Sequence, residues 1–185
     1  MKNILLLLLL LLNLNTYSQT IESVFCPPKK YKRTIQNEYH KWIINQKLNL
    51  NDPVKYYDGN IKYGQNDIYK AKFVYDIGDQ NLHHCADAAM YNHARYLFET
   101  KQYEKIVFTD NFTGKKYYYT KAFDIYNEST FRTYIVNCWR NMGTWSLETY
   151  DTVAVNIKDI QTGDVFLKGG FPGHAISVVD VVINK

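Results

Sequence analysis

A cysteine and a histidine are the residues of this sequence whose surroundings best fit catalytic chemistry. Cys85 lies near the start of a predicted helix, and His174 follows a glycine-rich loop at the start of a predicted apolar strand. Unpaired amide groups at the beginning of a helix stabilise a thiolate. A neighbouring imidazole can take or share the thiol proton. The two residues therefore suggest a nucleophile and its general base.

Both residues also have plain structural interpretations. Cys85 lies on the apolar stripe of its helix, where a small buried thiol would fit the core equally well. His174 can be a hydrogen-bonded side chain that holds the glycine-rich loop 168–173. Asp180 would lie roughly 20 Å along a regular strand from His174, which is too far to orient the ring. The sequence therefore leaves a third catalytic residue unassigned.

Histidines and carboxylates near the predicted nucleophile raise the alternative of a zinc site. His83 and Asp87 are spaced i, i+4, and His84, His93 and His174 are available elsewhere. No recognised zinc signature accompanies them. We therefore predict no metal ligand and no cofactor. Asp87 can instead cap the helix, face solvent or line a cleft.

Hydrophobic periodicity predicts the elements that position the two candidate residues. Asp164 follows a turn glycine and is predicted to bond the backbone of that turn, and the loop 168–173 then delivers His174 at the mouth of a hairpin. The predicted helices cover 34–45, a segment with apolar positions from 82 to 97, and a segment from about 129 that ends at a left-handed Gly143. The predicted strands cover 70–77, 106–109, 116–120, a short strand ending at 167, and 175–183.

The first eighteen residues have the pattern of a cleavable secretory signal. Lys2 precedes an apolar run of about 11 residues, and small and polar residues follow before Gln19. A helix that spans a bilayer needs about 20 apolar residues, so this segment is too short for an anchor. We predict a signal peptide at 1–18 and one globular domain at 19–185. The mature protein is expected to be soluble and exported, in the periplasm or outside the cell.

Charge and cysteine content narrow the function classes. The formal charge is +4, and losing Lys2 with the signal leaves +3, without a basic block or a nucleic-acid motif. We therefore predict no nucleic-acid partner. The three cysteines cannot all pair with one another, so one is free in an oxidising compartment. Cys26 and Cys138 can be unpaired thiols or can form a bridge, while the neighbours of Cys85 suggest chemistry.

Several stretches together resemble the exported bacterial family described as domain of unknown function 4846. The resemblance runs through nearly all of the mature chain, and its last block is the most specific. The family carries no settled activity. The stretches are CPPKKYKR at 26–33, VKYYDGNIK at 54–62, DIGDQNLHHCADAAM at 76–90, GTWSL at 143–147 and IQTGDVFLKGGFPGHAISVVD at 160–180.

The last block also looks similar to NlpC-like and CHAP-type papain-like cysteine peptidases and amidases. This similarity implies an α+β fold, with a small antiparallel sheet packed on helices, and a thiol hydrolase of peptide or amide bonds at the cell envelope. Cys85 would be the nucleophile and His174 the base, with a peptidoglycan peptide or another envelope amide as substrate. The alternative is a non-catalytic envelope binding domain that retains the cleft.

Two departures from the relatives bear on this choice. Relatives tend to carry two glutamines where this chain has His83 and His84, which puts an oxyanion role for a glutamine amide in doubt. Relatives also continue past Lys185 with a further polar strand, so the chain can be a C-terminally shortened member. A shortened member would lack an orienting residue and would have an exposed sheet edge.

Overall fold

The computed structural model describes residues 18–64 and 68–184. The predicted signal peptide at 1–18 therefore lies outside the described residues, apart from Ser18. Within the described ranges, no helix is both long and apolar enough to cross a membrane.

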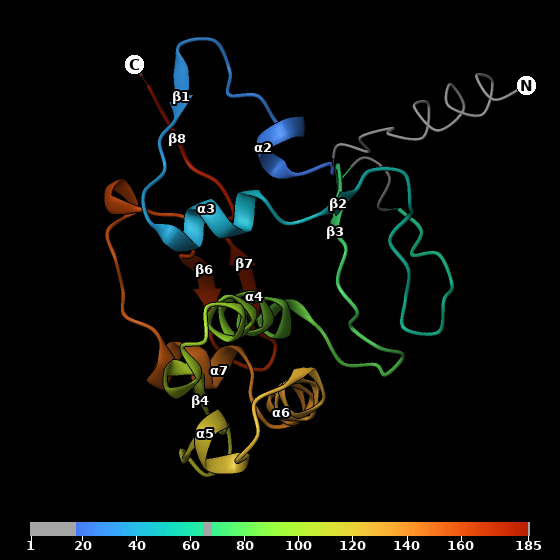
Figure 1. The fold of residues 1–185 in the computed structure, drawn as a ribbon, viewed down its shortest axis with the longest axis vertical. Coiled ribbons are helices and arrows are strands. Elements are labelled where there is room, and N and C mark those ends of the chain that lie inside the picture. Colours follow the sequence, from blue (N-terminus) through green and yellow to red (C-terminus); the bar gives the residue numbers. More distant parts are fainter. Residues whose placement is uncertain (1–17, 65–67, 185) are drawn as a thin grey trace, which may run out of the picture.

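Helices and short strands alternate along the described chain (Figure 1). The helical segments are α2 (Ile21–Val24), α3 (Glu38–Ile44), α4 (Cys85–Glu99), the 3-10 turn η1 (Tyr103–Lys105), α5 (Tyr119–Ala122), α6 (Glu128–Asn141), α7 (Thr144–Ser146), the π-helical turn η2 (Leu147–Asp151) and the 3-10 turn η3 (Ile157–Asp159). The strands are β1 (Tyr31–Arg33), β2 (Leu48–Asn49), β3 (Lys72–Phe73), β4 (Val107–Thr109), β5 (Lys116–Tyr118), β6 (Val165–Lys168), β7 (His174–Ser177) and β8 (Val182–Asn184).

The described strands form separate antiparallel pairs, which are β1 with β8, β2 with β3, β4 with β5, and β6 with β7. The prediction of a mixed fold with small antiparallel sheets is therefore confirmed. Figure 1 shows α4 at the centre of the molecule, between α6 and the β6–β7 hairpin, and β7 packs directly on α4. The papain-like outline stays a prediction.

The main core lies between α4 and α6, and its side chains are largely aromatic. Tyr134 and Ile135 of α6 are completely buried, as is Ala94 of α4. The start of α6 is fixed by a reciprocal cap, in which Asn127 accepts the Thr130 amide at 3.0 Å and the Thr130 hydroxyl accepts the Asn127 amide at 3.1 Å. The other buried residues of this core are Ala86, Met90, Tyr91, Leu97, Phe98, Ile106, Phe108, Tyr119, Phe131, Cys138, Trp139, Met142 and Leu147.

The long apolar strand predicted at 175–183 is wrong. β7 ends at Ser177, and a separate strand, β8, pairs with β1 on the other side of α3 (Figure 1). Between the two strands, the Asp180 carboxylate accepts hydrogen bonds from Arg33 and His40. These contacts draw the chain away from β6 and toward α3, so the apolar run is divided between two strand pairs.

Other predicted boundaries change for local reasons. The helix predicted at 34–45 begins only at Glu38, because Asn37 caps α3 by accepting the His40 amide at 2.8 Å. The strand predicted at 70–77 is reduced to Lys72–Phe73. Gly143 has a φ of −173°, so it is extended and not the left-handed cap that we predicted. The role of Asp164 is confirmed, because its carboxylate accepts the Gln161 amide at 2.7 Å.

Candidate functional site

Cys85 is the first residue of α4, and its thiol is partly exposed and free. The His84 carbonyl accepts the Ala88 amide at 3.0 Å, so regular helical bonding begins with that pair. The amides of Cys85 and Ala86 donate to no described residue. They therefore leave unpaired N–H groups at the N-terminus of a long helix, where negative charge is stabilised.

Asp87 caps this helix, which is one of the three roles that the sequence predicts for it. Its side chain is 4% exposed, and a carboxylate oxygen accepts the His84 amide at 2.7 Å. Burial raises the pKa of Asp87 above its ordinary value, although the hydrogen bond from His84 opposes that rise. Asp87 therefore stabilises the turn that presents Cys85 and does not face a substrate.

His83 precedes α4 in a left-handed conformation, with a φ of 66°. Its ring packs edge-on against Trp139, with centroids 4.8 Å apart, and its Nδ1 is buried without a hydrogen-bond partner. Burial first, and then the charges of Arg132 and His84, lower the pKa of His83 to about 4. The ring is therefore neutral near pH 7 and belongs to the packing beneath the helix start.

The β6–β7 hairpin is oriented along α4 by contacts at its open end. A Cβ built on Gly163 would lie 3.1 Å from the Tyr39 ring, and that ring lies edge-on to Tyr96 in the last turns of α4, with centroids 5.3 Å apart. Farther along β6, Leu167 lines the same cavity as Ala89 of α4. The hairpin therefore runs from the C-terminal end of α4 toward its N-terminal end.

Element lengths then set the position of His174. The axis of α4 covers about 16 Å from Tyr96 back to Cys85 at 1.5 Å per residue. An extended chain covers about 16 Å from Gly163 to Lys168. Lys168 pairs with His174, so the start of β7 comes to the level of the start of α4. These lengths predict that the two candidate residues lie toward the same end of α4.

The side chain of His174 nevertheless points to the outer face of the hairpin. Along β7, Ala175 is buried, whereas His174 and Ile176 are exposed, as expected for side chains that alternate between two faces. Phe166 of β6 is 52% exposed and pairs with Ile176 on the same outer face. In the described structure, no hydrogen bond joins the Cys85 thiol to the His174 ring. The structure therefore does not pair the two predicted catalytic side chains with each other.

The Asp180 carboxylate is bound to Arg33 and His40, and the argument from a regular strand does not apply because the strand ends at Ser177. Arg33 donates to it at 2.7 Å, and His40 Nε2 lies 3.0 Å from its other oxygen. Burial alone would raise the pKa of Asp180, but the hydrogen bonds from Arg33 and His40 outweigh it and hold that pKa below its ordinary value. The Gln36 amide donates to His40 Nδ1 at 3.3 Å, so the neutral His40 carries its proton on Nε2.

The other two cysteines differ in their exposure to solvent. Cys26 is exposed, and Cys138 is completely buried in the α6 core, where burial raises its pKa. All three thiols are free. The open question of a bridge between Cys26 and Cys138 is thus answered in this structure by two unpaired thiols, and Cys138 is a core residue.

The residues considered for zinc do not converge. Within the described ranges, no three His, Cys, Asp or Glu side chains form a group that could hold a metal ion. His83 and Asp87 do not share a helix face, because α4 begins at Cys85, after His83. His93 is exposed on α4, and its ring lies edge-on to Phe108 with centroids 6.5 Å apart.

Residues 21–185 match the family described as domain of unknown function 4846. The chain belongs to this family. The family resemblance inferred from its motifs is therefore confirmed. No curated protein and no solved structure matches the chain. The similarity to NlpC-like and CHAP-type enzymes consequently stays a prediction that rests on the chain's own residues.

The sequence did not predict two groups of residues that the structure brings together. One is the cluster of Arg33, His40 and Asp180, whose members are up to 147 positions apart and carry no shared motif. The other is a polar pocket beside α4. Its helical residues Tyr91, Arg95 and Glu99 follow one another at intervals of four. That spacing was a visible signal of one polar helix face.

Proposed function

We propose that this protein is a thiol-dependent hydrolase of peptide or amide bonds that acts at the bacterial cell envelope. One observation carries the proposal: Cys85 is a partly exposed thiol at the first position of a long helix, beside unpaired backbone amides. The predicted signal peptide at 1–18 supports a site of action outside the cytoplasm. A peptidoglycan peptide or a similar envelope amide would be the substrate.

In the proposed reaction, Cys85 Sγ attacks the carbonyl carbon of the scissile amide as its proton moves to His174. The amides of Cys85 and Ala86 stabilise the resulting oxyanion. The C–N bond then breaks, the amine leaves with the proton from His174, and an acyl thioester remains on Cys85. Water, deprotonated by His174, hydrolyses the thioester and restores the thiol.

The reaction requires the His174 side chain to rotate around the end of β7 toward α4. His174 is the first residue of its strand and is exposed, so no packing holds the ring on the outer face. Catalytic hydrogen bonds commonly tighten only when a substrate is bound. Substrate that enters beside Cys85 would select the inward rotamer.

Selective alkylation tests the proposal. At about pH 5.5, well below the ordinary cysteine pKa near 8.5, an unactivated thiol reacts slowly with iodoacetamide. We expect Cys85 to be carboxamidomethylated at least about tenfold faster than Cys26, as measured by peptide mass spectrometry over time. Cys26 is the appropriate reference because it is exposed, whereas Cys138 is protected by burial alone. Equal rates at Cys85 and Cys26 would contradict an activated nucleophile.

The second candidate is a non-catalytic envelope binding domain, and the outward position of His174 favours it. On that reading, His174 joins the exposed side chains of Phe166 and Ile176 in a contact surface on the hairpin. Alkylation at equal rates, together with loss of ligand capture in a Phe166→Ser variant, would support this function over hydrolysis.

A further inference from the structure

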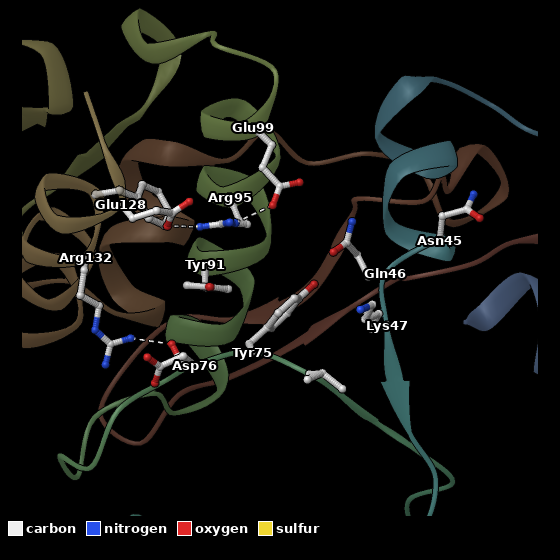
Figure 2. A pocket seen from close by; sticks show the side chains of 12 residues that line it. Asn45, Gln46, Lys47, Tyr75, Asp76, Tyr91, Arg95, Glu99, Glu128 and Arg132 are labelled. Atoms are coloured by element: carbon white, nitrogen blue, oxygen red, sulfur yellow. Dashed lines mark hydrogen bonds and ion pairs between the residues drawn. The ribbon is translucent and has the colours of Figure 1, made fainter. Parts of the chain in front are cut away.

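A pocket of about 560 Å³ lies on the side of α4 that faces α6, away from the β6–β7 hairpin. Its walls come from α4, the first turns of α6, the segment before α4 and the turn after α3 (Figure 2). This volume is within the range of about 300–1,000 Å³ that is typical of small-molecule sites. The lining residues with polar side chains are Asn45, Gln46, Lys47, Tyr75, Asp76, Tyr91, Arg95, Glu99, Glu128 and Arg132.

Arg95 is at the centre of a fixed polar network in this pocket. Its Nε donates to Glu99 at 2.7 Å, and another guanidinium nitrogen donates to Glu128 at 2.6 Å (Figure 2). The guanidinium also lies over the Phe131 ring, 5.6 Å from its centroid. Carboxylate acceptors and guanidinium donors are thus held side by side before any ligand arrives, which lowers the cost of ordering them on binding.

The charges that line the pocket balance. Three basic residues, Lys47, Arg95 and Arg132, face three acidic ones, Asp76, Glu99 and Glu128. Arg132 is further tied to the Asp76 backbone carbonyl at 2.6 Å. A phosphate or another strongly anionic ligand would find no excess positive charge here. A neutral ligand with many hydroxyl groups can use both the donors and the acceptors.

Aromatic rings form the remaining wall. Tyr75 stacks on Phe73 with centroids 5.2 Å apart, and Tyr91 lies against it at 5.0 Å. The Tyr75 hydroxyl is buried without a hydrogen-bond partner, and Figure 2 shows it directed into the space bordered by Gln46. An unpaired buried hydroxyl is unfavourable, so a ligand oxygen that reached it would restore a lost hydrogen bond.

We propose that this pocket binds a neutral saccharide. The C–H face of a sugar ring would pack on the exposed part of Tyr75, and its hydroxyls would bond to Glu99, Glu128 and Arg95. The site is separate from the thiol chemistry proposed for Cys85 and does not depend on it.

Calorimetric titration of the full mature chain with soluble trimers of N-acetylglucosamine, glucose and mannose tests the assignment. We expect at least one trimer to bind with a Kd of about 1 mM or tighter. In the Tyr75→Phe variant, the Kd should weaken about fivefold, because one hydrogen bond is lost, while the thermal midpoint is unchanged or higher. Tyr103→Phe, a tyrosine outside the pocket, is the matched control and should bind as the wild type does.

Glu128→Gln provides a second variant, because its side chain is 68% exposed and contributes little to folding. It should weaken binding about tenfold by loosening Arg95 and removing a charged acceptor. Cys85→Ala should leave the Kd unchanged. No binding by any trimer at about 10 mM would overturn the proposal, as would an affinity that neither Tyr75→Phe nor Glu128→Gln reduces.

Discussion

At the scale of single residues, the start of α4 combines a partly exposed thiol with polar groups that have partners or pack in the core. Cys85 is partly exposed, whereas Asp87 directs its carboxylate to the His84 amide and His83 packs its ring on Trp139. The two polar neighbours thus stabilise the local turn. Of these residues, Cys85 is the one that the proposed reaction uses.

The buried His83 predicts a loss of stability in mild acid. Its pKa is about 4 in the folded protein and near 6.5 when the chain unfolds, so the unfolded state binds more protons between these values. The stabilisation is complete above pH 6.5 and is lost as the pH falls toward 4. The loss should be on the order of 3 kcal/mol.

Urea unfolding at several pH values from 4 to 7 measures this effect in the wild type and in His83→Gln. The variant loses ring packing at every pH, but its unfolding free energy should fall less steeply between pH 6.5 and 4. Identical pH dependence in the two proteins would show that His83 is not buried in its neutral form. Asp180 does not interfere with this measurement. Because its pKa is lowered, the stabilisation that its carboxylate provides is lost at still lower pH.

At the scale of elements, the sequence predicts those helices and loops that are set by a local pattern of residues. The apolar stripes of α4 and α6 specify helices because their period matches one buried face. The glycine loop before His174 was also recognised correctly. A Cβ on Gly173 would lie 2.7 Å from the carbonyl oxygens of Gly170 and Lys168, so no larger residue fits.

The bounds of other elements depend on contacts with residues far away in the sequence, and these bounds could not be predicted in the same way. The apolar run at 175–183 has the composition of one strand, yet Asp180 divides it through contacts with Arg33 and His40. Likewise, the helix start at Cys85 depends on Asp87 and on the unusual backbone of His83. A single sequence shows the residue types but not which partners lie across space.

The Asp180 cluster should therefore anchor β8 and β1 to α3. Asp180→Ala removes the acceptor of the completely buried His40 and of Arg33, and should lower the unfolding free energy by about 2 kcal/mol. Chemical denaturation measures the change, and Asp159→Ala, a substitution in the exposed turn η3, is the control. A variant as stable as the wild type would show that this cluster does not hold the strands together.

At the scale of the whole molecule, α4 separates two candidate sites. The hairpin with His174 lies on one side of the helix, and the pocket around Arg95 lies on the other (Figure 1, Figure 2). Cys85 is the first residue of this helix. Under the two proposals, one helix would position a nucleophile and, independently, a saccharide site.

The most direct measurement of the central claim is the rate of Cys85 alkylation across pH 5–8, in the wild type and in His174→Ala, with Cys26 followed in the same samples. We predict that the exposed His174 ring also samples the inward rotamer in the free protein, so that wild-type Cys85 stays reactive at the acid end. His174→Ala should slow Cys85 there at least about tenfold while Cys26 is unaffected. If Cys85 reacts at the same rate with and without the imidazole at every pH, the two residues do not act together and the hydrolase proposal fails.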